Sequence, residues 1–99
     1  MLILMGHIYL DPSEAVDFIA DTRDFVANTQ KLEGCLFYSI ALDDQATGRV
    51  LTVERWKDQD ALTAHTQRPE MAEVMGKWMS RIKMDIQKYD ASNERDLTN

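Results

Sequence analysis

The chain has 99 residues, 44% of them hydrophobic, with a formal net charge of −6 and a single cysteine, Cys35. That length makes one domain, and its acidic surface repels the phosphates of nucleic acids and of anionic membranes. One cysteine excludes an intrachain disulfide, and no apolar run approaches the roughly 18 residues that span a bilayer. The opening residues 1–5 lack the positive flank and the cleavage site of a signal peptide. We therefore expect a soluble, cytoplasmic protein that binds neither nucleic acid nor membranes.

The first third of the chain predicts a strand followed by a long helix. Residues 2–10 are apolar on both faces, which is typical of a strand that is buried on both sides. Asp11 and Pro12 then provide an N-cap and a favourable first helical residue. Apolar residues recur with the helical period as far as Leu32, and Gly34 is a natural stop. We expect one continuous helix over this segment.

The middle of the chain predicts two strands and then a second helix. Residues 35–42 and 49–57 alternate in the manner of strands, and the polar residues 43–48 between them form a hairpin loop. Asp58 is a good N-cap because its carboxylate can accept from free N–H groups of the first turn. The helix that it starts should end near Thr66.

The last third of the chain predicts a third helix, a fourth strand and a tail. Pro69 disfavours helical geometry in the residue before it and can itself open a helix. The apolar stripe of that helix consists of Met71, Met75, Trp78 and Ile82. Residues 83–89 alternate as a strand, and the polar residues 91–99 form a frayed tail. We therefore expect a single domain over residues 1–90.

The predicted order β-α-β-β-α-β is that of the ferredoxin-like split βαβ fold in the α+β class. Its helices can cover only one face of a four-stranded antiparallel sheet. Since the strands carry apolar residues on both faces, the other face needs a partner. We expect a homodimer in which two such sheets meet face to face and make a dimeric α/β barrel.

The sequence carries no motif for a metal ion or an organic cofactor. It has no CxxC, no glycine-rich phosphate loop, no HExxH and no nucleophile elbow. Two histidines without clustered carboxylates do not provide the spacing of a metal site. We expect an enzyme of this kind to use no cofactor and to rely on its side chains and on the reactivity of its substrate.

His65 is the strongest candidate for catalysis. With Ala61 and Leu62 it shares one helical face, which should turn toward the sheet and carry the imidazole into an apolar cleft. An imidazole titrates near neutral pH, so it could act as a general base or as a hydrogen-bond donor to a substrate oxygen. The alternative is a half-buried histidine that is bonded to a backbone carbonyl.

Four other residues are candidates for substrate binding. Met75 and Trp78 would form a wall opposite the histidine that suits a flat phenol, although such a stripe is also typical of a core. Tyr38 could add a hydroxyl to this pocket or simply pack across the strands. His7 could share acid and base duties with His65 if both point into one cleft; otherwise it is a core residue.

Glu54 and Trp56 share one face of their strand. Leu51 and Val53, on the other face, have the more core-like side chains, so we expect Glu54 and Trp56 at the barrel interior or at the dimer interface. Burial of Glu54 without a partner would be costly. It is therefore either held by an ion pair or hydrogen bond across the dimer, or it is a base with a raised pKa.

Several of these segments together resemble the antibiotic biosynthesis monooxygenase family. They are the first strand and capped helix, Gly34-Cys-Leu-Phe-Tyr38, Glu54-Arg-Trp56, and Ala61-Leu62 leading to His65. The resemblance implies a dimeric α+β barrel. It also implies a pocket role for His65 and, in members like this chain, cofactor-independent oxidation of aromatic phenols to quinones. Heme-degrading relatives take an axial histidine from a segment that here, at residues 71–79, contains none.

The sequence therefore predicts a cofactor-independent monooxygenase that oxidises a phenolic or quinol-like small aromatic molecule with O2. The catalytic residue is His65, and the substrate-binding residues are His7, Tyr38, Met75 and Trp78. Two alternatives stay open at this point. One is a small-ligand-binding dimer without catalysis, and the other is an isomerase that uses the same cleft.

Overall fold

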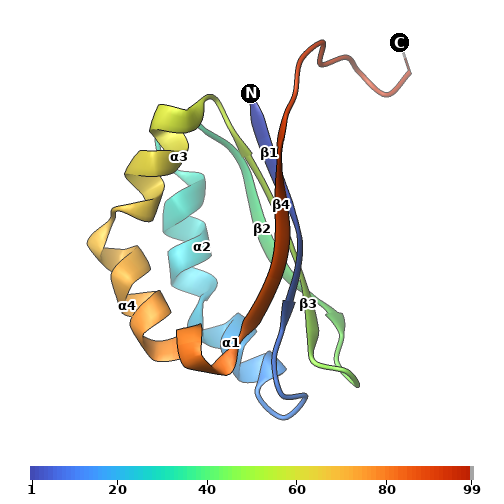
Figure 1. Ribbon diagram of the computed structural model, residues 1–99, viewed down its shortest axis with the longest axis vertical. Coiled ribbons are helices and arrows are strands. Elements are labelled where there is room, and N and C mark those ends of the chain that lie inside the picture. The colour runs from blue at the N-terminus through green and yellow to red at the C-terminus, as the bar shows by residue number, and fades with distance from the viewer. Residues whose placement is uncertain (99) are drawn as a thin grey trace.

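Figure 1 shows the computed structural model, which describes residues 1–98 and places a layer of helices on one face of a sheet. The elements are β1 Leu2–Tyr9, α1 Ala15–Asp21, α2 Arg23–Gln30, β2 Cys35–Asp44, β3 Arg49–Trp56, α3 Gln59–Thr66, α4 Pro69–Trp78, the 3₁₀ turn η1 Met79–Arg81, and β4 Lys83–Asp90. The four strands are antiparallel in the order β2-β3-β1-β4. The predicted ferredoxin-like α+β fold is confirmed.

The first helical segment differs from the prediction at its start and at its middle. Helix α1 begins at Ala15, because the Asp11 carboxylate accepts from the backbone and the hydroxyl of Ser13 in a preceding turn. The segment is also divided at Thr22. The Thr22 hydroxyl donates to the carbonyl of Phe18 at 2.8 Å, a bond of a kind that bends helices, while the backbone N–H of Thr22 also donates to this carbonyl at 3.0 Å.

The junction between β3 and α3 agrees with the prediction. The Asp58 carboxylate accepts from the backbone N–H of Ala61 at 2.9 Å and caps α3. Helix α3 ends at Thr66, since Arg68 has the extended geometry that a following proline imposes, with ψ 142°. Pro69 then opens α4. Sharp local signals therefore fix the position of the helix that carries His65.

The strand register decides which side chains face the helices. Glu54 lies opposite Leu4 and Tyr38, and Trp56 belongs to the buried cluster that also includes Leu62 of α3. Trp56 is 0% exposed within a single chain. Leu51 and Val53 are only partly buried and face the open side. The sequence predicts Leu51 and Val53 on the core side of β3. In the structure Glu54 and Trp56 face the helices instead.

Two apolar clusters hold the helices against the sheet. One comprises Leu2, Phe25, Tyr38, Trp56 and Leu62, and the other comprises Ile8, Leu10, Phe18, Val50 and Trp78. Burying one such large side chain contributes roughly 1.5–3 kcal/mol relative to leaving it exposed. Ile40 and Val74 touch both clusters, and both line the cavity that lies between them.

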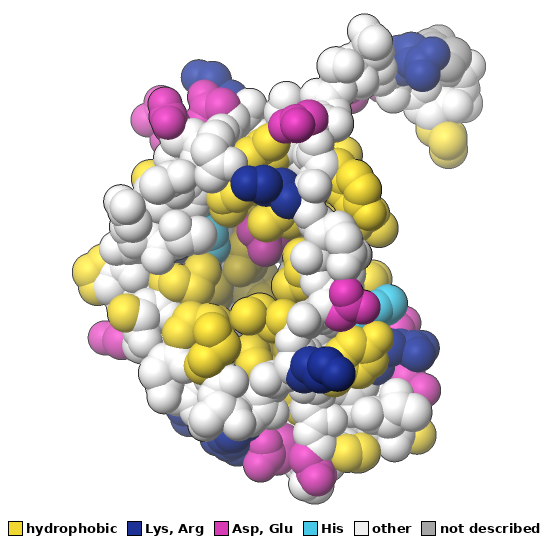
Figure 2. Space-filling model, viewed as in Figure 1, with side chains coloured by type: hydrophobic (Ala, Val, Ile, Leu, Met, Phe, Trp, Pro, Cys, Tyr) yellow, Lys and Arg dark blue, Asp and Glu magenta, His cyan; other side chains and the backbone are white. Residues whose placement is uncertain are grey.

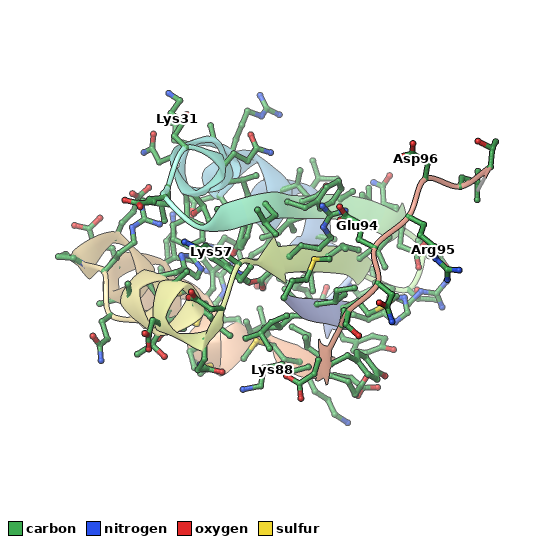
Figure 3. The ribbon with its side chains drawn as sticks, turned by 90° about the horizontal axis from the view of Figure 1, so that it is seen from above. Lys31, Lys57, Lys88, Glu94, Arg95 and Asp96 are labelled. Atoms are coloured by element: carbon green, nitrogen blue, oxygen red, sulfur yellow. The ribbon has the colours of Figure 1, made fainter. Side chains whose placement is uncertain are left out.

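The segment after β4 leaves the sheet on the side opposite the helices. Figures 1 and 3 show it running away from the body of the protein, with Glu94, Arg95 and Asp96 labelled in Figure 3. Arg55, on the open face of β3, forms an ion pair with Glu94 at 3.3 Å. Across residues 1–98, no helix is long and apolar enough to cross a membrane.

Candidate functional site

A cavity of about 340 Å³ lies between the helices and the sheet. Figure 2 shows hydrophobic side chains gathered around the hollow that opens between the helical layer and the edge strand β4. The apolar wall is formed by Ile8, Phe18, Phe25, Ile40, Met71, Val74, Met75, Ile82, Met84 and Ile86. Its volume and apolar lining are typical of a site for a small organic molecule.

The cavity wall also includes five residues with polar side chains: Thr22, Tyr38, Thr52, Glu54 and Thr66. The hydroxyl of Thr22 already donates to a backbone carbonyl. Burial, followed by the charge of Glu54, raises the pKa of Tyr38 well above its usual value, so this phenol stays protonated. Among the residues that line the cavity, Glu54 is the one that carries a carboxylate, which can accept a proton.

The carboxylate of Glu54 is held by its neighbour on the same strand face. Trp56 Nε1 donates to Glu54 Oε1 at 2.9 Å. Burial raises the pKa of Glu54, and this hydrogen bond acts in the opposite direction because it favours the charged form. A carboxylate whose pKa is raised in this way is a stronger base than one in water.

His65 lies behind the cavity wall and is not one of the residues that line it. Its side chain is buried, and aromatic rings surround it. The indole of Trp56 stacks on the imidazole with centroids 4.8 Å apart, while Tyr38 and Phe25 pack at 5.4 Å and 5.7 Å. The sequence predicts His65 inside the cleft. In the structure it packs against the wall residues Tyr38 and Phe25 and does not itself line the cavity.

Arg68 fixes the tautomer of the imidazole. Its Nη1 lies 3.3 Å from His65 Nδ1. A guanidinium has no acceptor, so Nδ1 must accept, and the neutral ring carries its proton on Nε2. Burial, followed by the charge of Arg68, lowers the pKa of His65 to about 4, so the ring is neutral at pH 7. The basic nitrogen is thus already occupied.

The other nitrogen, Nε2, is buried without a hydrogen-bond partner among residues 1–98. His65 therefore has a free N–H donor at Nε2, whereas its basic nitrogen, Nδ1, already accepts from Arg68. Of the two roles that the sequence leaves open for this residue, general base and donor, the geometry disfavours the first. The alternative of a bond to a backbone carbonyl is also absent from the described contacts of the ring.

The remaining predicted residues divide between the cavity and other places. Tyr38 and Met75 line the cavity. Trp78 does not, because it is buried edge-on against Phe18 and its Nε1 donates to Asp21 at 2.7 Å. Trp78 therefore packs in the core and is not part of the cavity wall.

His7 lies on the open face of the sheet, with Nε2 3.5 Å from Asp43. Since His65 packs beneath the helices on the other face, the two histidines cannot share acid and base duties. Glu54 and Trp56 are also on the helix-covered face, so they do not lie on the sheet face that we expect to form a dimer interface.

Sequence reasoning missed the contributions of Thr52 and Arg68. Thr52 lines the cavity two residues before Glu54, and strand alternation alone could have placed it there. The sequence pattern identifies Arg68 only as the residue before a proline. In the structure Arg68 contacts Thr29 Oγ1 at 3.1 Å, His65 at 3.3 Å and Glu70 Oε2 at 2.8 Å. No local sequence pattern predicts these contacts. Among residues 1–98, no cluster of three or more His, Cys, Asp or Glu could hold a metal ion.

Comparison with solved structures finds the same fold. A candidate antibiotic biosynthesis monooxygenase from Deinococcus radiodurans superposes with a TM-score of 0.84 at 20% identity, over 98% of each chain. A similarly named protein from Caulobacter crescentus gives a TM-score of 0.82 at 19% identity, over 93% of this chain and 90% of that one. A conserved protein from Methanosarcina mazei gives 0.80 at 18% identity, over 92% of each chain.

At the level of sequence, a search of curated proteins gives no match. The family model for antibiotic biosynthesis monooxygenase, in contrast, matches residues 1–77. This span includes β1 to β3, α3 and most of α4, and with them Glu54, Trp56 and His65. The chain belongs to the antibiotic biosynthesis monooxygenase family.

Proposed function

We propose that the protein oxidises a phenolic or quinol-like small aromatic molecule with O2, without a cofactor. The observation that best supports this proposal is the position of Glu54, a carboxylate in an otherwise largely apolar cavity of about 340 Å³. Aromatic and methionine side chains such as Phe25, Met71 and Met75 offer flat, polarizable contacts to a ring. The cofactor-free members that the sequence resembles act on substrates of this class.

The proposed chemistry begins with proton transfer from the phenol to Glu54. The resulting phenolate is electron-rich, and the apolar walls keep water from stabilising it. It reduces O2, and a bond forms between oxygen and the ring carbon para to the phenolate. The O–O bond then breaks. One oxygen atom stays on the ring, the ring C–H proton is lost, and the other oxygen leaves as water, so phenol and O2 give quinone and water.

Glu54 both accepts and returns a proton in this sequence. It takes the phenolic proton at the start and donates it to the leaving oxygen at the end. A positioned general base typically contributes about 10²–10⁴-fold in rate. Tyr38, which stays protonated, can donate its hydroxyl to an oxygen of the substrate.

The experiment is oxygen uptake by metal-stripped protein with a panel of phenols and naphthols that carry hydrogen at the para carbon, followed by mass spectrometry of products made under ¹⁸O₂. Uptake that requires protein and places one labelled atom in the product supports the proposal. Binding of a phenol without uptake would indicate a ligand-binding protein. Conversion of a substrate without consumption of O2 would indicate an isomerase.

We also propose that the protein acts as a homodimer through the open face of its sheet. This face carries Ile3, Met5, Phe37, Leu51, Val53 and Tyr89, as the strand register places them side by side. Met5, Phe37 and Tyr89 are 45%, 48% and 52% exposed, and apolar patches of this kind mark interaction surfaces. A second copy of the chain would cover them.

Sedimentation of Met5→Glu tests the dimer. A charge in the middle of the covered face should shift the protein to monomer at micromolar concentration. Val16→Glu is the matched control, since Val16 is 49% exposed on helix α1, away from this face. A monomeric wild-type protein would contradict the proposal.

A further inference from the structure

We infer that His65 and Arg68 are positioning residues for Glu54, and that they act through Trp56. The inference rests on the proposed function, in which Glu54 exchanges a proton with the substrate. It assigns to His65 a role that needs no contact with the substrate. Three successive contacts connect Arg68, at the start of α4, with the carboxylate on the cavity wall.

The first contact fixes the imidazole from the helical side. Arg68 donates to Thr29 Oγ1 on α2 at 3.1 Å and to Glu70 Oε2 on α4 at 2.8 Å. A guanidinium that is anchored at two points on two helices has little freedom. Its Nη1 therefore holds His65 Nδ1 in a set direction, and the ring cannot turn over without losing this bond.

Through the second contact, the fixed imidazole restricts the orientation of the Trp56 indole. The planes of His65 and Trp56 are inclined by only 27°, and their centroids lie 4.8 Å apart. Tyr38 packs edge-on against both rings. Trp56 is 0% exposed, so the imidazole fills a space that water or a smaller side chain would leave open for rotation of the indole.

The third contact reaches the cavity. Trp56 Nε1 donates to Glu54 Oε1 at 2.9 Å, and within the described chain it is the hydrogen-bond partner of this carboxylate. The bond stabilises the charged form and fixes one carboxylate oxygen. It thereby leaves the other oxygen, Oε2, for a ligand in the cavity.

The other groups around Glu54 do not provide a comparable donor. Tyr38 and Cys35 on β2 make no hydrogen bond to Glu54 among the described contacts, and because burial raises the pKa of both, neither places a charge beside it. On β1 the neighbour is Leu4. Beyond it on β4 is Lys88, whose ammonium donates to Gln59 of α3 at 2.9 Å. Displacement of Trp56 should therefore change the basicity of Glu54 directly.

The test is the titration of the Glu54 carboxyl carbon by ¹³C NMR, together with the pH profile of kcat/KM for oxygen uptake. In Trp56→Phe the pKa of Glu54 should rise further, because the donor is gone. In His65→Leu, which fills the space without a flat ring, it should move in the same direction. In His65→Phe, which keeps a ring to stack on but loses the bond to Arg68, the rise should be smaller than in His65→Leu.

The acidic limb of the kcat/KM profile should follow the same order. It should move to higher pH in Trp56→Phe and in His65→Leu, and by less in His65→Phe. Trp78→Phe is the matched control, since it removes an indole that is as deeply buried and that also donates to a carboxylate, Asp21, at 2.7 Å. The titration of Glu54 should not change in this variant.

An unchanged Glu54 titration in folded His65→Leu would overturn the inference. So would equal loss of turnover in His65→Phe and His65→Leu without a change of this titration, since that pattern requires His65 to act on the substrate itself. The NMR measurement does not depend on turnover. If no phenol supports oxygen uptake, the proposed function fails while the titration still decides the coupling between His65 and Glu54.

Discussion

His65 stacks on Trp56 with ring centroids 4.8 Å apart, and the indole of Trp56 in turn donates to Glu54 at 2.9 Å. The sequence suggests separate tasks for these residues, with His65 as a base and Trp56 and Glu54 at a dimer interface. In the fold they form one unit inside a single subunit. The carboxylate, rather than the imidazole, is the part of this unit that lines the cavity.

The buried imidazole should make stability depend on pH. The pKa of His65 falls from its ordinary value of 6.5 to about 4 on folding. As the pH drops below 6.5, the unfolded chain takes up the proton first, and the free energy of unfolding decreases until the pH reaches about 4. The loss that is due to this residue is on the order of 3 kcal/mol.

Urea unfolding of wild type and His65→Phe at several pH values between 7 and 4 measures this effect. Phenylalanine does not titrate, so the variant should lose less stability over this range. Because both proteins share every other titratable group, the difference between their slopes reports on His65. Parallel pH dependences would contradict the lowered pKa.

The pKa of Glu54 predicts an opposite effect. Burial raises it, so the unfolded chain ionises first as the pH increases. The free energy of unfolding therefore falls as the pH rises through the folded pKa. Glu54→Gln keeps an acceptor for Trp56 without a charge to bury, and at pH 8 its Tm should exceed that of the wild type by about 2–5 °C.

The gain should disappear below pH 4, where both states of the wild type hold the proton. Glu14→Gln is the control, since Glu14 forms a partly exposed ion pair with Arg81 at 3.1 Å and should give no gain at pH 8. Calorimetric scans of the three proteins at pH 8 and below pH 4 suffice. A Tm of Glu54→Gln below that of the wild type at pH 8 would contradict a net free-energy cost of burying the Glu54 charge.

Features that a few neighbouring residues encode could be predicted from the sequence. The Asp58 cap and the Pro69 start fix α3 and α4, and both are contained within one helical turn. The order of strands and helices followed from such local signals and gave the fold. The break at Thr22 could not be predicted, because the apolar period continues through it and backbone hydrogen bonds cross it.

The candidate site was harder to predict, since β3 is apolar on both faces. Alternation separates Val53 from Glu54 but does not say which of them faces the helices. That choice is made by packing against Phe25 and Leu62, which lie on other elements. The same limit applies to His7, whose ion-pair partner Asp43 comes from the end of β2, distant in sequence.

Two glycines should respond in opposite ways to the same substitution. Gly48 has a φ of +73°, and a Cβ there would collide with the carbonyl oxygen of Leu10, so Gly48→Ala should cost about 1–3 kcal/mol or more. Gly76 lies within α4, and an added Cβ there would meet no atom within 4 Å beyond its chain neighbours and the backbone of its own helix. Gly76→Ala should therefore stabilise by about 0.5–1 kcal/mol. Chemical denaturation of both variants provides the measurement, and equal effects would contradict the loop geometry.

Binding to the cavity should depend on its methionine wall. Met75 lines the cavity, whereas Met79, four residues later, is 52% exposed and does not. Truncation of Met75 to alanine removes apolar contact with a ligand worth about 1 kcal/mol, which corresponds to an approximately fivefold weaker Kd for a naphthol. Met79→Ala should bind as the wild type does in isothermal titration calorimetry. A comparable loss in both variants would place the ligand elsewhere.

The most direct test of the central claim is the rate of oxygen uptake by Glu54→Gln at saturating phenol. Glutamine keeps the size of the side chain and an acceptor for Trp56 but cannot take up a proton. We expect kcat to fall by about 10²–10⁴-fold while the Kd of the phenol changes little. A kcat within a factor of about two of the wild type would contradict the assignment of Glu54 as the base.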